Sequence, residues 1–60
     1  MKPNKAQVNR IKMRFFKLGP GSKSRAAIAT GLKHSQITRL IKGGTIKEEK
    51  YDALIYHLDL

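Results

Sequence analysis

The chain has 60 residues, no cysteine, and two histidines, His34 and His57, that lie far apart in the sequence. This length indicates one domain, residues 1 to 60, and the composition excludes a disulfide framework and a zinc site. Thirteen Lys and Arg against four Asp and Glu give a net charge of +9, and all but one of these cations precede Glu48, the first acidic residue. So basic a surface attracts phosphates by releasing counterions, which predicts a nucleic-acid partner.

Several function classes find no support in the sequence. No apolar run is long enough to span a membrane and there is no signal-peptide core, so we expect a cytoplasmic protein. The serines lack a neighbouring histidine and carboxylate, and the glycine-rich stretches lack the lysine-serine pair of a phosphate-binding loop. We therefore expect no enzyme, no metal, no cofactor and no small-molecule ligand.

The first predicted helix spans residues 4 to 18. Asn4 followed by Gln7 forms a capping-box-like start, because the Asn oxygen can accept an amide of the first turn. Apolar residues then recur at steps of three and four, which is one stripe of a helix: Val8, Ile11, Phe15 and Leu18. Gly19-Pro20-Gly21 ends the helix.

A short second helix follows, with Ser22 or Ser24 as its cap, and ends at Gly31. Its inward side is expected to hold small residues: Ala26, Ala27 and Thr30. Leu32 fills the corner after the glycine. A third helix, about residues 34 to 42, buries its apolar positions, Ile37, Leu40 and Ile41, and stops at Gly43-Gly44.

The fourth predicted helix begins at a capping box formed by Thr45 and Glu48 and runs to the C-terminus. Its stripe is Tyr51, Leu54, Ile55 and Leu58. No strand pattern or repeat is present. The sequence therefore predicts an all-α fold, a compact four-helix domain with short loops.

Ala27, Gly31 and Ile37 are separated by four and then six residues, and Leu32 directly follows the glycine. Two helices joined in this way cross at a small residue, turn at the glycine, and seat the second helix on the core. The segment LKHSQITRLIKGG resembles the helix-turn-helix of the phage repressor and Cro family, with its lambda-repressor-like domains, and also the LacI headpiece. The resemblance covers about residues 4 to 58 and implies a DNA-binding domain.

The chain departs from the family's pattern at four places, one of which is Thr30, where leucine often precedes the glycine of the turn. Many relatives carry glutamine at the start of the second helix, where it braces on a phosphate, and this chain has Lys23 there. Lys33 opens the recognition helix where serine or threonine is common, which leaves the start of that helix open. Ile28 lies outside the inward positions of the second helix.

By this resemblance, the polar side of the third helix reads base edges through His34, Ser35, Thr38 and Arg39. Arg39 matches the two acceptors of guanine in the major groove, and the Thr38 methyl suits thymine. Phosphate contacts position the protein without reading sequence. We expect them from Lys23, Lys33, Gln36 and Lys42.

The fourth helix has more apolar surface than one core stripe requires. We expect a second face that forms a homodimer: Ile46, Ala53, Tyr56 and Leu60. Two copies would then present their recognition helices roughly 34 Å apart on a palindromic operator. Tyr56→Asp should weaken both the dimer and operator binding.

The sequence thus predicts a sequence-specific double-stranded DNA-binding regulator, a small Cro-like repressor of phage or prophage type that blocks transcription. Three other small DNA-binding roles stay open: an excisionase-like architectural factor, an antitoxin and an autorepressor. A basic RNA-binding protein is a weaker alternative, because the chain has no aromatic stacking platform on a sheet. A membrane-active helix is disfavoured, because glycine and proline interrupt the chain.

Overall fold

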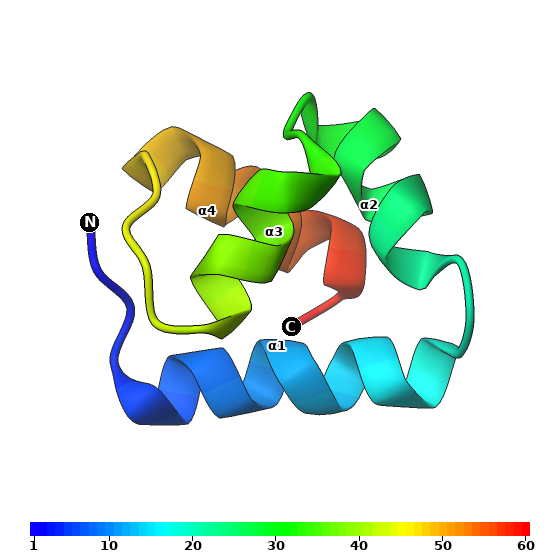
Figure 1. Cartoon of the computed structure of the whole chain (residues 1–60), viewed down its shortest axis with the longest axis horizontal. Coiled ribbons are helices and arrows are strands. Elements are labelled where there is room, and N and C mark those ends of the chain that lie inside the picture. The colour runs from blue at the N-terminus through cyan, green and yellow to red at the C-terminus, as the bar shows by residue number, and fades with distance from the viewer.

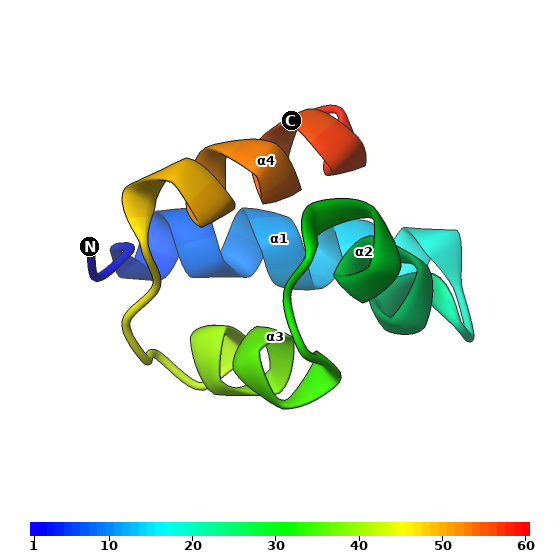
Figure 2. The same ribbon diagram turned by 90° about the horizontal axis from the view of Figure 1, so that it is seen from above.

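The computed structural model describes all 60 residues and contains four helices, α1 (Lys5–Leu18), α2 (Ser22–Thr30), α3 (His34–Ile41) and α4 (Glu48–Leu58), and no strand. The predicted all-α, four-helix fold is therefore confirmed. The longest helix, α1, runs along one edge of the molecule, and the other three pack beside it (Figure 1). Seen from above, α3 and α4 lie on opposite sides of α1 (Figure 2). None of the helices has the length and hydropathy that a membrane span requires.

The start of α1 is a capping box, as the sequence predicts. The Asn4 side chain accepts from the Gln7 amide at 2.8 Å, and the Gln7 side chain accepts from the Asn4 amide at 2.8 Å. At the other end the Gly19 amide donates to the Phe15 carbonyl, with Gly19 at a φ of 84°. Local sequence alone therefore defines both ends of this helix.

One cluster of nine buried residues forms the core: Ile11, Phe15, Ala26, Leu32, Ile37, Leu40, Tyr51, Leu54 and Leu58. Every helix contributes to it, so removing any of them would open the core. Two residues of the predicted α1 stripe lie at its margin. Val8 is half-buried, and Leu18 is 46% exposed because α1 ends there.

The predicted serine cap of α2 is wrong. Gly21 is the N-cap, at a φ of 83°, and no side chain caps the helix. Ser22 instead turns back and donates its hydroxyl proton to the Phe15 carbonyl at 3.3 Å. That carbonyl belongs to the last turn of α1 and also accepts from the Gly19 amide, so Ser22 adds a second hydrogen bond to it. Ser22 therefore ties the two helices together, and the first turn of α2 keeps free amides.

The turn between α2 and α3 has the predicted form. Gly31 adopts the left-handed conformation, with a φ of 75°, and its amide donates to the Ala27 carbonyl at 3.0 Å. Leu32, only 7% exposed, fills the corner. Thr30 is buried and satisfies its hydroxyl by donating to the Ala26 carbonyl at 2.7 Å. Ile28 points outward and is 85% exposed, so the predicted register of α2 is confirmed.

Gly31→Ala should lower the free energy of unfolding by about 1 to 2 kcal/mol, because a side chain disfavours the left-handed conformation by that much. The added carbon would lie 3.1 Å from the Lys50 Nζ, a flexible end that can move away. Gly31→Asn is the matched control, since Asn tolerates this conformation, and it should cost less. Urea denaturation followed by circular dichroism measures both. Equal losses would show that crowding against Lys50, rather than backbone conformation, decides the effect.

The predicted Thr45–Glu48 capping box at α4 is also wrong. The N-cap is Lys47, and no side chain caps the helix. Ile46 forms two hydrogen bonds with the start of the chain: its amide donates to the Met1 carbonyl, and its carbonyl accepts from the Met1 amino group. This pairing holds the segment before α4 extended, so the helix begins only at Glu48. Glu48 and Glu49 lie in its first turn, where the positive end of the helix stabilises their negative charges.

Candidate nucleic-acid interface

The helix α3 has one buried side and one exposed side. Ile37 and Leu40 are 0% and 1% exposed, and Ile41 is half-buried against the core. The other side of the helix carries Ser35 and Arg39, both exposed. Because α3 packs against α1 and α2 through the apolar side only, its polar side faces solvent. This arrangement is what the sequence predicts for a recognition helix.

Three of the four predicted base-contacting residues lie together. They line one polar hollow on the outside of α3, which is formed by Ser35, Thr38, Arg39, Lys42, Gly43 and Gly44. Gly44 leaves space for the arginine. A Cβ atom at Gly44 would lie 2.5 Å from the Arg39 Cγ and 2.9 Å from its carbonyl oxygen, so the stem of Arg39 needs a glycine there.

The Thr38 hydroxyl is already used within the helix, where it donates to the His34 carbonyl at 3.1 Å. The hydroxyl oxygen keeps acceptor capacity only, and the methyl is the group that suits an apolar contact. This agrees with the prediction that Thr38 contacts thymine through its methyl group and not through a hydrogen bond from its hydroxyl.

His34 does not share that hollow. It lines a groove of about 570 Å³ where the end of α1, the start of α2 and α3 meet, together with Lys12, Phe15, Phe16, Gly19, Pro20, Gly21, Ser22, Lys23, Ser24 and Ile41. The structure thus groups His34 with Lys23, a predicted phosphate contact, instead of with Ser35, Thr38 and Arg39. His34 therefore lies with the predicted phosphate contacts rather than with the predicted base contacts.

The groove is suited to an anion. The uncapped N-terminus of α2 opens into it, and free amides at a helix start attract negative charge. Two lysines, Lys12 and Lys23, add full positive charges. Lys12 was not among the residues predicted from the sequence, because it lies on α1, outside the helix-turn-helix. Its position beside Ile11, on the flank of the buried stripe, is the only sequence signal that could have found it.

The other predicted phosphate contacts divide into two kinds. Lys33 and Lys42 are exposed at the two ends of α3, as phosphate contacts on the two sides of a duplex groove would require. Gln36 has a structural role: its Oε1 accepts from the Lys33 amide at 2.7 Å. This bond satisfies the amide of the N-cap residue of α3 and occupies the Gln36 side-chain oxygen, so the Gln36 amide nitrogen is the group left for a phosphate.

Lys12→Ala should weaken binding to every duplex alike and reduce the slope of log affinity against log salt by about 0.9, the effect of one lost phosphate contact. Fluorescence anisotropy over a salt series measures the slope. Lys17→Ala is the matched control, because Lys17 lies in a different hollow, beside Arg10 and Leu60. If both variants change the slope equally, net charge rather than the groove determines it.

The four carboxylates of the chain lie on or next to α4 and are all exposed: Glu48, Glu49, Asp52 and Asp59. None of the four lines the polar hollow outside α3 or the groove beside it. A polyanion approaching α3 therefore meets lysine and arginine. No group of three or more His, Cys, Asp or Glu side chains could hold a metal ion.

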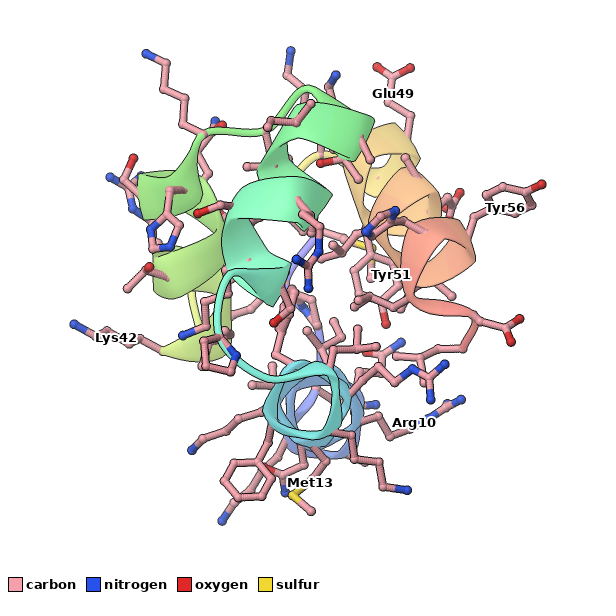
Figure 3. The ribbon with its side chains drawn as sticks, turned by 90° about the vertical axis from the view of Figure 1, so that its right-hand side faces the viewer. Arg10, Met13, Lys42, Glu49, Tyr51 and Tyr56 are labelled. Atoms are coloured by element: carbon pink, nitrogen blue, oxygen red, sulfur yellow. The ribbon has the colours of Figure 1, made fainter.

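The predicted dimer residues differ in how far they are exposed. Ile46 precedes α4 and packs half-buried against the core, and its place in a dimer face stays a prediction. Ala53 is half-buried, Leu60 is 37% exposed, and Tyr56 is 90% exposed. The side chains of Tyr56 and Lys42 project in opposite directions (Figure 3).

The direction of Tyr56 relative to α3 determines whether a dimer through this face could bind the predicted palindromic operator. A two-fold axis through Tyr56 would turn the two α3 helices away from each other. Two recognition helices on one palindrome must instead point to the same side of the dimer. The predicted palindromic arrangement through this face therefore does not fit the fold.

No family model, curated protein or solved structure matches this chain. The interface is defined by its geometry and charge.

Proposed function

We propose that this chain is a sequence-specific double-stranded DNA-binding protein that reads the major groove with α3 and acts as a small transcriptional regulator of the Cro-like, repressor kind. One observation carries the proposal. The buried side of α3 anchors it to the core, while Ser35, Thr38, Arg39 and Lys42 line one polar hollow on its outside.

The dimensions and chemistry of this surface support major-groove reading. A groove of about 12 Å width admits one α-helix, and each base pair presents a distinct donor and acceptor pattern there. Arg39 can form two hydrogen bonds to guanine. Thr38 offers its methyl to thymine, and Ser35 can donate or accept. These three residues are the proposed base-contacting set.

Phosphate contacts would hold the helix in register. Lys42 and Lys33 lie at the two ends of α3, and Lys23 and Lys12 line the groove beside it. With cations on both flanks of α3, the protein would bind any duplex weakly and its preferred site more tightly. A copy bound at a promoter would exclude polymerase sterically, which gives repression without a catalytic group.

Selection from random duplexes at about 0.15 M salt tests the proposal, because this salt weakens binding by charge alone. Reading by three or four side chains predicts enrichment of a short motif of a few base pairs, and a guanine within it should depend on Arg39. If no motif emerges, or if single-stranded RNA competes better than duplex DNA, the proposal is wrong.

A further inference from the structure

Two different surfaces lie side by side on the face of the molecule that is turned away from α3. We call them the α4 patch and the α1 patch. The α4 patch consists of Asp52 and Tyr56, four residues apart and therefore on one side of the helix. Tyr56 is 90% exposed, the largest exposed fraction among the large apolar and aromatic side chains. No carboxylate takes part in the side-chain hydrogen bonds of the molecule, so Asp52 is unpartnered.

The α1 patch is basic and partly apolar. It is a hollow between α1 and the C-terminus, lined by Asn9, Arg10, Met13, Arg14, Lys17 and Leu60. Arg14 is fixed in place, since its Nε donates to the Leu58 carbonyl at 2.8 Å. Arg10 is exposed and free to meet a partner. Arg10 and Tyr56 project to the same side of the molecule, away from Lys42 (Figure 3).

We propose that these two patches join two copies of the chain back to back. A two-fold axis between the patches would place the α4 patch of each copy on the α1 patch of the other. Arg10 of one copy then meets Asp52 and the ring of Tyr56 of its partner, and the same contact occurs twice. The occupant of this face is a second copy because the chain itself supplies both halves of the charge complementarity.

The pairing of α4 with α4 is the less favourable alternative. It would bring Glu49 and Asp52 of two copies together without a cation between them, and like charges in contact are destabilising. Pairing the α4 patch of each copy with the α1 patch of the other avoids this repulsion. It also leaves Ala53 and Leu60, two of the residues predicted for a dimer, at or beside the contact.

The dimer should be weak, because two chains of net charge +9 repel each other. At about 0.15 M salt the repulsion is screened beyond about 8 Å, whereas the contacts between Arg10 and Asp52 are short and persist. Few side chains take part in the contact, so we expect a Kd on the order of 1 µM to 1 mM. Bound DNA would neutralise the repulsion and favour the dimer.

Back-to-back pairing has a consequence that rests on the proposed function. The two α3 helices face outward in opposite directions, so one dimer can hold two separate DNA segments. The chain would then link distant sites, as an architectural protein does, rather than occupy two halves of one palindrome.

Sedimentation equilibrium without DNA tests the interface, independently of the proposed function. The wild-type chain should form dimers, and Asp52→Arg and Arg10→Asp should each weaken dimerisation about tenfold, because each change places like charges together twice. An equimolar mixture of these two variants should recover dimers, since all the contacts between unlike variants are attractive. A misfolded variant could not recover in this way.

Lys5→Asp is the control for net charge, because it makes the same charge change as Arg10→Asp on the same helix. It should not weaken dimerisation. A wild-type chain that stays monomeric at 1 mM, on the order of the weakest Kd expected, would overturn the proposal. So would variants that dimerise as the wild type does, or a mixture that fails to recover.

Energy transfer between donor-labelled and acceptor-labelled duplexes tests the link between two DNA segments. The wild type should produce transfer, and Asp52→Arg should raise the protein concentration needed for transfer about tenfold while still binding a single duplex. Loss of all duplex binding by the wild type would contradict the proposed function and leave the DNA-free dimer result standing. Dimers that bind one duplex but never two would overturn the back-to-back arrangement.

Discussion

Replacing Ile37 by alanine should unfold much of the chain at temperatures where the wild type is folded. Ile37 is 0% exposed and seats α3 on the core. An Ile→Ala change at such a site costs about 2 to 5 kcal/mol, through lost burial and the cavity left behind. A 60-residue domain has a total stability of only about 3 to 9 kcal/mol. One substitution therefore removes a large part of it.

The matched control lies in the same helix-turn-helix. Ile28→Ala makes the same chemical change at a residue that is 85% exposed, and it should change stability by no more than about 0.5 kcal/mol. Thermal and urea denaturation, followed by circular dichroism, compare the two. A loss at Ile28 as large as the loss at Ile37 would show that α2 or α3 packs in a different register from the one described here.

The second large effect is on recognition. Arg39→Ala should cost about 1 to 3 kcal/mol on the preferred site, which is a loss of affinity of about 5- to 150-fold. The loss should be small on unrelated duplexes, because Arg39 lies in the polar hollow proposed to contact bases. At one base pair of the site, the variant should accept other bases almost equally. Competition titrations with single-base variants of the site measure this.

Lys42→Ala is the comparison for that experiment. Lys42 follows the last turn of α3 and is expected at a phosphate, so its removal should weaken all duplexes alike and lower the salt slope by about 0.9. If both variants lose affinity in the same manner, the division into base and phosphate contacts is wrong. Both side chains are exposed, so both variants should keep the unfolding transition of the wild type.

The parts of the fold that local sequence determines could be predicted. Asn4 with Gln7 and the glycine after Leu18 define α1, because a cap and a left-handed residue act within one turn of the helix. The same holds for the corner at Gly31, where the glycine conformation and the burial of Leu32 are both local consequences of the sequence. The turn between α2 and α3 could therefore be predicted from the sequence.

The wrong predictions concern helix starts, where hydrogen bonds to residues distant in the sequence determine the structure. Thr45 and Glu48 have the spacing of a capping box, yet Ile46 is held extended by Met1, 45 residues earlier in the chain. Ser22 was expected to cap its own helix, but its hydroxyl donates to the Phe15 carbonyl of α1 instead. In both cases a tertiary hydrogen bond replaces a local one, and helical spacing carries no information about it.

The candidate site shows the same division. Periodicity separates the polar residues of α3 from Ile37 and Leu40, since both sides belong to one helix. It could not show that His34 joins the groove with Lys23, or that Lys12 of α1 lies there. Nor could it give the direction of Tyr56 relative to α3, which depends on how α4 packs across the core.

An amide spectrum of the labelled chain, titrated with its selected duplex, tests most directly whether α3 lies in a DNA groove. Reading by α3 predicts that the largest changes fall on Ser35, Thr38 and Arg39, with smaller ones at Lys23 and none at Asp52 or Tyr56. Changes centred on α4, or spread evenly over every lysine and arginine whatever the duplex sequence, would contradict it.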